Sequence, residues 1–111
     1  MARSKALPAA SLHVAIALLD GELHGYALMR RVEELSDGAV RMGPGTLYGT
    51  LSRLVETGLI EETTDRAPRE GNERRRYYQL TANGRVIAID ELTRLQGLVH
   101  RSARHLPGAP A

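Results

Sequence analysis

The hydrophobic periodicity of the sequence changes twice, and these changes limit the folds that the chain can adopt. Apolar residues first recur at helical spacing in three successive segments, each ended by a glycine or proline signal. The pattern then alternates as in strands on both sides of a polar stretch, and afterwards returns to helical spacing. We therefore predict helices over 8–19, 24–37 and 43–58, strands over 59–64 and 74–80, and a last helix over 82–106.

This order of elements is typical of a winged helix-turn-helix, in which a β-hairpin follows three helices. The predicted fold class is mainly α with a small β-hairpin, followed by a long C-terminal helix. At 111 residues the chain has the length of a single domain. We expect a DNA-binding unit with its N-terminal helix over 1–81, and a dimerisation helix with a short tail over 82–111.

The composition excludes several kinds of site. The sequence has no cysteine, so it can form neither disulfides nor thiolate metal sites. It contains no Gly-rich phosphate loop before a lysine, and the spacing of its four histidines does not indicate a metal site. No apolar run approaches the roughly 18 residues of a membrane span. We expect a cytoplasmic protein without cofactor or metal that is not an enzyme.

The third predicted helix has two different sides. Leu47, Leu51 and Leu54 recur at spacings of four and three, which indicates the side that faces the core. The remaining positions are rich in hydroxyl groups, and these can bond phosphate oxygens or base edges in the DNA major groove. The residues expected to contact DNA from this helix are Thr46, Tyr48, Thr50 and Arg53. The alternative is an ordinary solvated helix surface.

Basic residues gather at the tip of the predicted hairpin and at the start of its second strand. Residues 66–76 hold five arginines, which form a clustered anion-binding footprint. Arginines on such a loop reach the minor groove or its phosphates. The predicted DNA contacts in this wing are Arg66, Arg69, Arg74 and Arg75. The alternative for individual arginines is an ion pair with Glu61, Glu62 or Glu73.

The last predicted helix has an apolar seam that is longer than the hairpin on which it could pack. A helix that exposed such a stripe to water would be unusual, and a symmetric partner would cover it. The residues expected at this dimer interface are Leu12 and Ile16 of the first helix and Leu92, Leu95 and Val99 of the last. The alternative is packing of the seam over the three-helix core of the same chain.

Three stretches in order resemble the PadR family of bacterial transcriptional regulators, over roughly Ala15 to Ala88. They read LLDGELHGYALMRRV, GPGTLYGTLSRLVETGLI and RRRYYQLTANG. The sequence departs from the family pattern at Gly49, where a proline is usual, and at Gly43, where a serine is common. The resemblance implies a transcriptional regulator that dimerises through its C-terminal helix. We expect a repressor that binds a palindromic operator in double-stranded DNA as a homodimer.

Two other functions remain open from the sequence. One is a winged-helix module that assembles with other proteins without DNA, and the basic wing argues against it. The other is a small-molecule binding protein, or a regulator whose effector binds at the dimer interface. Because the chain has no Phe and no Trp, only tyrosines could stack on an aromatic ligand there.

Overall fold

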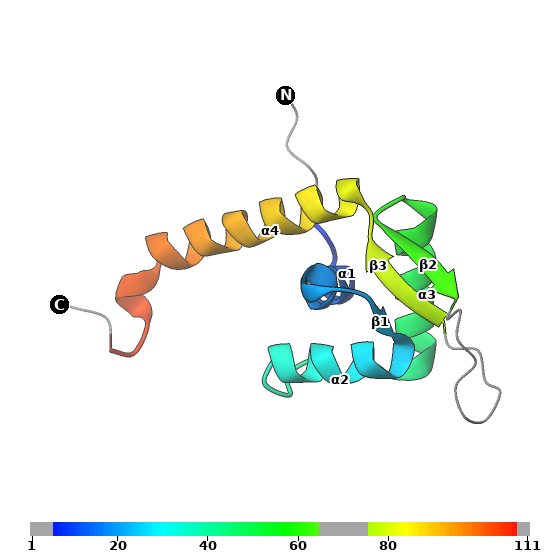
Figure 1. The fold of residues 1–111 in the computed structure, drawn as a ribbon. Coiled ribbons are helices and arrows are strands. Elements are labelled where there is room, and N and C mark those ends of the chain that lie inside the picture. Colours follow the sequence, from blue (N-terminus) through cyan, green and yellow to red (C-terminus); the bar gives the residue numbers. More distant parts are fainter. Residues whose placement is uncertain (1–5, 65–75, 109–111) are drawn as a thin grey trace.

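In a computed structural model the chain folds as helices around a small antiparallel sheet, described over residues 6–64 and 76–108 (Figure 1). This arrangement confirms the predicted fold class. The elements in chain order are α1 (Ala9–Ala17), the 3-10 helix η1 (Leu18–Asp20), β1 (Leu23–His24), α2 (Gly25–Leu35), α3 (Pro44–Glu56), β2 (Ile60–Thr64), β3 (Arg76–Leu80), α4 (Ala82–Arg101) and the 3-10 helix η2 (Ala103–His105).

The sheet of the described chain has three strands in the order β1-β3-β2, one more than the predicted hairpin. β2 pairs with β3 so that Ile60 lies opposite Leu80, and β1 places Leu23 opposite Tyr78. The predicted second helix was wrong at its start, because His24 belongs to β1 and caps α2. Its Nδ1 accepts the Ala27 N–H at 3.3 Å, which satisfies a backbone donor of the first turn. A strand of two residues shows no alternation that a sequence could reveal.

The core lies between α1, α2, α3 and the inner side of the sheet. Its fully buried large side chains come from all of these elements: Val14, Leu18, Leu28, Val32, Leu47, Leu51 and Ile60. The predicted burial of the leucines of α3 is confirmed. On the first helix Val14 is buried, whereas Leu12 and Ile16, the residues expected at the dimer interface, are only half-buried. α1 contacts α2, α3 and α4, so neighbours cover more than one of its sides.

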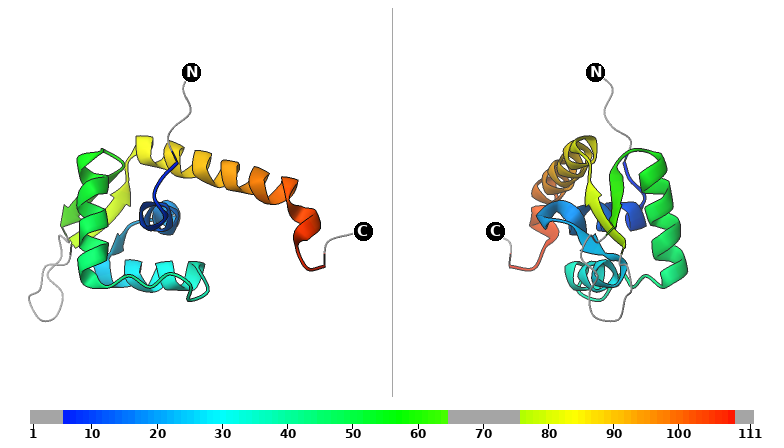
Figure 2. Two further views of the ribbon diagram at one scale, coloured as in Figure 1. Left: turned by 180° about the vertical axis from the view of Figure 1, so that it is seen from behind. Right: turned by 45° about the vertical axis from the view of Figure 1, so that its right-hand side comes forward.

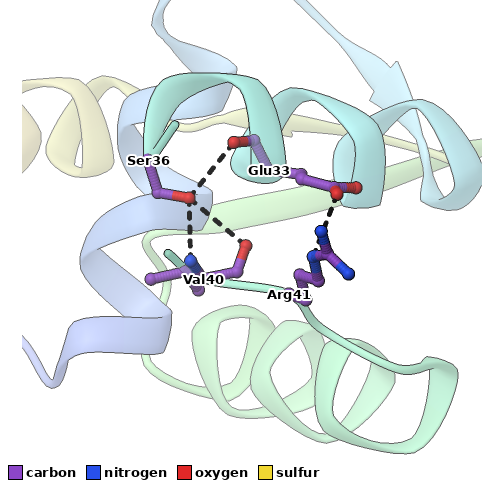
Figure 3. A network of polar contacts seen from close by, with 4 residues as sticks. All are labelled: Glu33, Ser36, Val40 and Arg41. Carbon is purple, nitrogen blue, oxygen red and sulfur yellow. Dashed lines mark hydrogen bonds and ion pairs between the residues drawn. The ribbon is translucent and has the colours of Figure 1, made fainter. Parts of the chain in front are cut away.

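The turn between α2 and α3 is closed by the hydroxyl of Ser36 (Figure 3). Its Oγ accepts the Val40 N–H at 2.9 Å and lies 3.2 Å from the Glu33 carbonyl oxygen, to which it can donate. Met42, two residues after Val40, is buried in the core. The link to α3 is therefore held at both ends, which sets the direction in which α3 leaves the turn.

The end of α3 and the start of α4 meet at the end of the β2–β3 pair where Ile60 lies opposite Leu80. Gly58 lies two residues after the end of α3, and its φ of +77° is the left-handed conformation that glycine adopts readily after a helix end. The Thr81 hydroxyl donates to the Gly58 carbonyl at 2.6 Å and accepts the Gly84 N–H at 3.0 Å. Gly84 itself lies against the carbonyl group of Leu59. The start of α4 is thereby held against the C-terminal end of α3.

The first half of α4 packs on α1, and its second half extends beyond the rest of the molecule (Figures 1 and 2). Glu91 is buried on the packed side, where its carboxylate accepts the Leu7 N–H at 3.2 Å. Hydrogen bonds from the Arg94 guanidinium, both at 3.2 Å, lower the pKa of the Glu91 carboxyl although burial opposes this. The helix predicted through 106 was wrong at its end, because α4 stops at Arg101 and η2 follows.

Candidate nucleic-acid interface

The solvent side of α3 is a smooth, polar surface. Thr46, Ser52 and Arg53 are exposed on it. Gly45 and Gly49 lie one turn apart on the same side, and a Cβ built on either glycine would meet no atom within 4 Å. Arg53 makes no ion pair with any described residue, so its guanidinium is available to an anion or to a base edge. The structure thus places Thr46 and Arg53 together on an accessible helix surface.

Thr50 does not belong to this surface, and its predicted outward position was wrong. Its side chain is fully buried, and its hydroxyl donates to the Thr46 carbonyl oxygen at 2.8 Å. Thr50 follows Leu47 by three residues and precedes Leu54 by four, which puts it on the leucine side of the helix. Because both its position and its hydroxyl are engaged inside the protein, Thr50 cannot reach DNA in this structure.

Tyr48 lies at the edge of the surface, between α3 and α2. Its side chain is 45% exposed, and a Cβ built on Gly25 would lie 2.5 Å from its hydroxyl oxygen. The phenol therefore packs across the first turn of α2, where the neighbouring Tyr26 is 64% exposed. This position leaves part of the Tyr48 ring accessible on the flank of α3.

The other tyrosines belong to the sheet. Tyr78 is buried, and burial raises the pKa of its hydroxyl. Tyr77 meets the ring of His24 edge to face, with the ring centroids 5.7 Å apart. These two side chains join β3 to the core and to β1, and they take no part in the exposed surface of α3.

The predicted wing contacts Arg66, Arg69, Arg74 and Arg75 lie outside the described residues. The neighbouring Arg76 begins β3 and pairs with Glu62 of β2, with Nε 3.4 Å from the carboxylate oxygen. The alternative of pairing with an acid thus applies to Arg76.

Arg41 is an exposed basic residue near α3 that sequence reasoning missed. It precedes the helix by three residues, and its Nε lies 3.1 Å from the Glu33 carboxylate (Figure 3). The sequence signal was its position in the short link before the third helix. That signal is weak, because an arginine in a link is usually only a solvated side chain.

Two further features bear on the possible kinds of site. Among residues 6–64 and 76–108, no three His, Asp or Glu side chains lie close enough together to hold a metal ion. No helix within these ranges is long and apolar enough to cross a membrane.

The helices α1 to α3, the antiparallel β2–β3 pair that follows them and the open face of α3 define a winged helix-turn-helix protein. A model of the PadR-like family of transcriptional regulators matches residues 14–88, and the chain belongs to this family. The resemblance seen in the sequence is confirmed, and the family is one of transcriptional regulators and not of enzymes.

Two similar proteins match most of this chain, but the match covers different shares of their own lengths. The chain is 40% identical over 97 residues to an uncharacterised 37.1 kDa protein of transposon TN4556 from Streptomyces fradiae. The matched region covers 85% of this chain and 26% of that protein. The chain thus spans about a quarter of that relative's length. It is 36% identical over 90 residues to transcriptional regulator Rv3488 of Mycobacterium tuberculosis, covering 81% of this chain and 78% of that one.

A solved structure shows the same fold. The crystal structure of Bacillus subtilis PadR in complex with operator DNA matches with a TM-score of 0.66 at 20% identity, over 85% of this chain and 59% of that chain. At this level of identity the likeness shows the fold of the described elements.

Proposed function

We propose that the chain is a sequence-specific DNA-binding regulator in the cytoplasm that acts as a repressor. The observation that carries this proposal is the open polar face of α3, where Thr46, Ser52 and Arg53 surround two glycines. Such a face can enter the major groove without a bulky side chain between the helix and the base edges. Family membership and the fold shared with a regulator solved on its operator support the proposal.

Within this function, the exposed groups divide into two roles. Thr46 and Arg53 read base edges, because both lie on the open side of α3. Tyr48 contacts a phosphate from the flank, where its ring is half-exposed. The wing arginines Arg66, Arg69, Arg74 and Arg75 add phosphate contacts from the segment that connects β2 to β3. Base contacts specify the sequence, while phosphate contacts position the protein.

The proposed repressor is a homodimer on a palindromic operator. On the projecting half of α4, Val99 is 55% exposed and Leu95 is half-buried, while Leu92 closer to the core is 37% exposed. Leu12 and Ile16 of α1 contribute apolar surface from a neighbouring element, since both are only partly covered. A second copy would remove this surface from water. Its α3 would then address a half-site about 34–36 Å away, or a multiple of that distance.

The division into a DNA-binding unit over 1–81 and a dimerisation helix over 82–111 stays a prediction. An effector site at the dimer interface also stays a prediction.

The test of sequence reading compares two DNA duplexes. The upstream region of the protein's own gene and a scrambled duplex of equal length are titrated with the wild type, Arg53→Ala and Thr46→Ala. We expect each variant to reduce the difference in affinity between the duplexes by about 1–3 kcal/mol where a base contact is lost. Arg31→Ala is the control. Arg31 belongs to α2 and not to α3, and its guanidinium lies 3.6 Å from the Asp20 carboxylate. Wild-type protein that binds neither duplex would refute the proposed function.

The dimer is tested by light scattering of Leu92→Asp and Leu95→Asp. A carboxylate on the seam would have to be buried against the partner, which is costly, so both variants should dissociate. Thr93→Asp is the matched control, because Thr93 is exposed and lies about 100° or more around the helix from both leucines. An unchanged dimer in both leucine variants would move the interface away from α4.

A further inference from the structure

The link between α2 and α3 presents one basic side chain on a rigid backbone. On one side of Arg41, the Val40 N–H donates to the Ser36 hydroxyl at 2.9 Å. On the other side, Met42 is buried in the core. The side chain of Arg41 between them is 77% exposed and stands just before the first turn of α3 (Figure 3). The fold therefore holds the backbone of Arg41 just before the first turn of α3, while its guanidinium lies accessible beside Glu33 of α2.

The ion pair between Arg41 and Glu33 is open to solvent. The Arg41 Nε lies 3.1 Å from a Glu33 carboxylate oxygen, and the Glu33 side chain is itself 47% exposed. Ion pairs between two exposed side chains contribute little to stability and are screened by salt. A guanidinium binds phosphate in the same bidentate manner as carboxylate. A phosphate of the DNA backbone can therefore replace Glu33 at low cost.

We propose that Arg41 is a DNA phosphate contact and that Glu33 is its competitor within the free protein. The proposal rests on the proposed DNA-binding function and extends it to a residue outside α3 and the wing. In the free protein Glu33 neutralises Arg41 in the link that leads into α3. On DNA the guanidinium leaves the carboxylate for a phosphate oxygen, and a counterion is released from the DNA. Glu33 then lowers affinity for every DNA sequence, because its carboxylate must first be displaced.

The two residues make opposite changes to binding, and a salt titration separates them. Binding to a random 30-bp duplex and to the protein's own upstream region is measured by fluorescence anisotropy between low and moderate salt. Arg41→Ala should weaken binding to both duplexes and reduce the log–log salt slope by about 0.9, the value for one phosphate contact. Arg41→Lys keeps the charge and should retain the wild-type slope. Glu33→Gln should bind both duplexes more tightly than the wild type.

Arg31→Ala removes a different arginine, which lies in α2 and pairs with Asp20, so it controls for the loss of charge alone. It should leave the slope unchanged. Thermal melting of each variant shows that the fold is kept, since both ion pairs are exposed.

Each result bears on one claim. If Arg41→Ala binds both duplexes as tightly as the wild type and with the same salt slope, the proposed contact is overturned while the DNA-binding function stands. If the salt slope falls by the same amount in Arg31→Ala, the loss reflects the net charge of the protein and not a specific contact at Arg41. Unaltered or weaker binding by Glu33→Gln would remove Glu33 as a competitor. Absence of wild-type binding to both duplexes would instead refute the DNA-binding function itself.

Discussion

Replacing Gly84 by alanine tests the contact between α4 and the end of α3. Gly84 lies in the first turn of α4, directly against the backbone of Leu59. A Cβ at this position would overlap the Leu59 carbonyl oxygen and lie 2.7 Å from its carbonyl carbon. Neither atom belongs to a flexible side chain, so the substitution requires α4 to move away from the backbone of Leu59. We expect Gly84→Ala to destabilise the fold strongly for this reason.

The magnitude follows from three contributions. Overpacking against a fixed neighbour costs about 3 kcal/mol, the upper part of the usual range. Displacing the Leu59 carbonyl also weakens the hydrogen bond that it accepts from the Thr81 N–H at 3.0 Å, a loss of about 1 kcal/mol. Alanine offsets roughly 1 kcal/mol through its better helix propensity. The net expectation is a loss of about 3 kcal/mol, or a melting temperature lower by roughly 12 °C.

The measurement is thermal and urea unfolding followed by circular dichroism at 222 nm. All proteins are compared at one concentration, because association would make the melting temperature depend on it. Gly45→Ala is the matched control, since Gly45 also lies in the first turn of a helix but has no atom within 4 Å of its built Cβ. It should be neutral or stabilised by up to about 1 kcal/mol. A Gly84→Ala protein that melts with this control would refute the reasoning.

Three further substitutions test single groups. Thr81→Ala removes the α4 cap and the donor to the Gly58 carbonyl, so urea unfolding should show a loss of about 2 kcal/mol that Thr81→Ser restores. Glu91→Gln should cost about 1–3 kcal/mol at neutral pH. Because the folded protein lowers the pKa of Glu91 below 4.5, this contribution is present above pH 4.5 and is lost as pH falls through the folded pKa. The stability curves of the wild type and Glu91→Gln against pH should therefore converge in acid. Parallel curves would contradict the assignment. Thr50→Val should leave binding to both DNA duplexes unchanged, since Thr50 is buried, and a specific loss of upstream-region binding would return it to the interface.

Local patterns along the chain determined most of the architecture. Apolar spacing at three and four residues places Leu47, Leu51 and Leu54 in the core, because a helix turns about 100° per residue. The change to alternation after Gly58 marks β2, and Thr81 marks the start of α4 as a cap. Each of these signals depends on residues within a few positions of one another, and the family resemblance rests on the same local stretches.

The tertiary structure decided the features that depend on contacts between distant segments. β1 forms because Leu23 and His24 lie beside β3, about 50 residues later, and the two residues alone carry no strand pattern. Glu91 is buried because the N-terminal segment crosses α4 at Leu7, whereas an acidic residue in a helix is ordinarily solvated.

The same distinction holds at the candidate interface. The hydroxyl-rich composition of α3 predicted a polar face, and the structure bears this out for Thr46 and Arg53. Thr50 was misplaced because its hydroxyl was given more weight than its spacing, which puts it three residues after Leu47 and four before Leu54, on the leucine side of the helix. The contact between Arg41 and Glu33 depends on the turn after α2, so the sequence alone did not single out Arg41. Sequence patterns determine which faces are apolar or polar, and the packing of segments far apart in the chain decides which polar groups remain open to a partner.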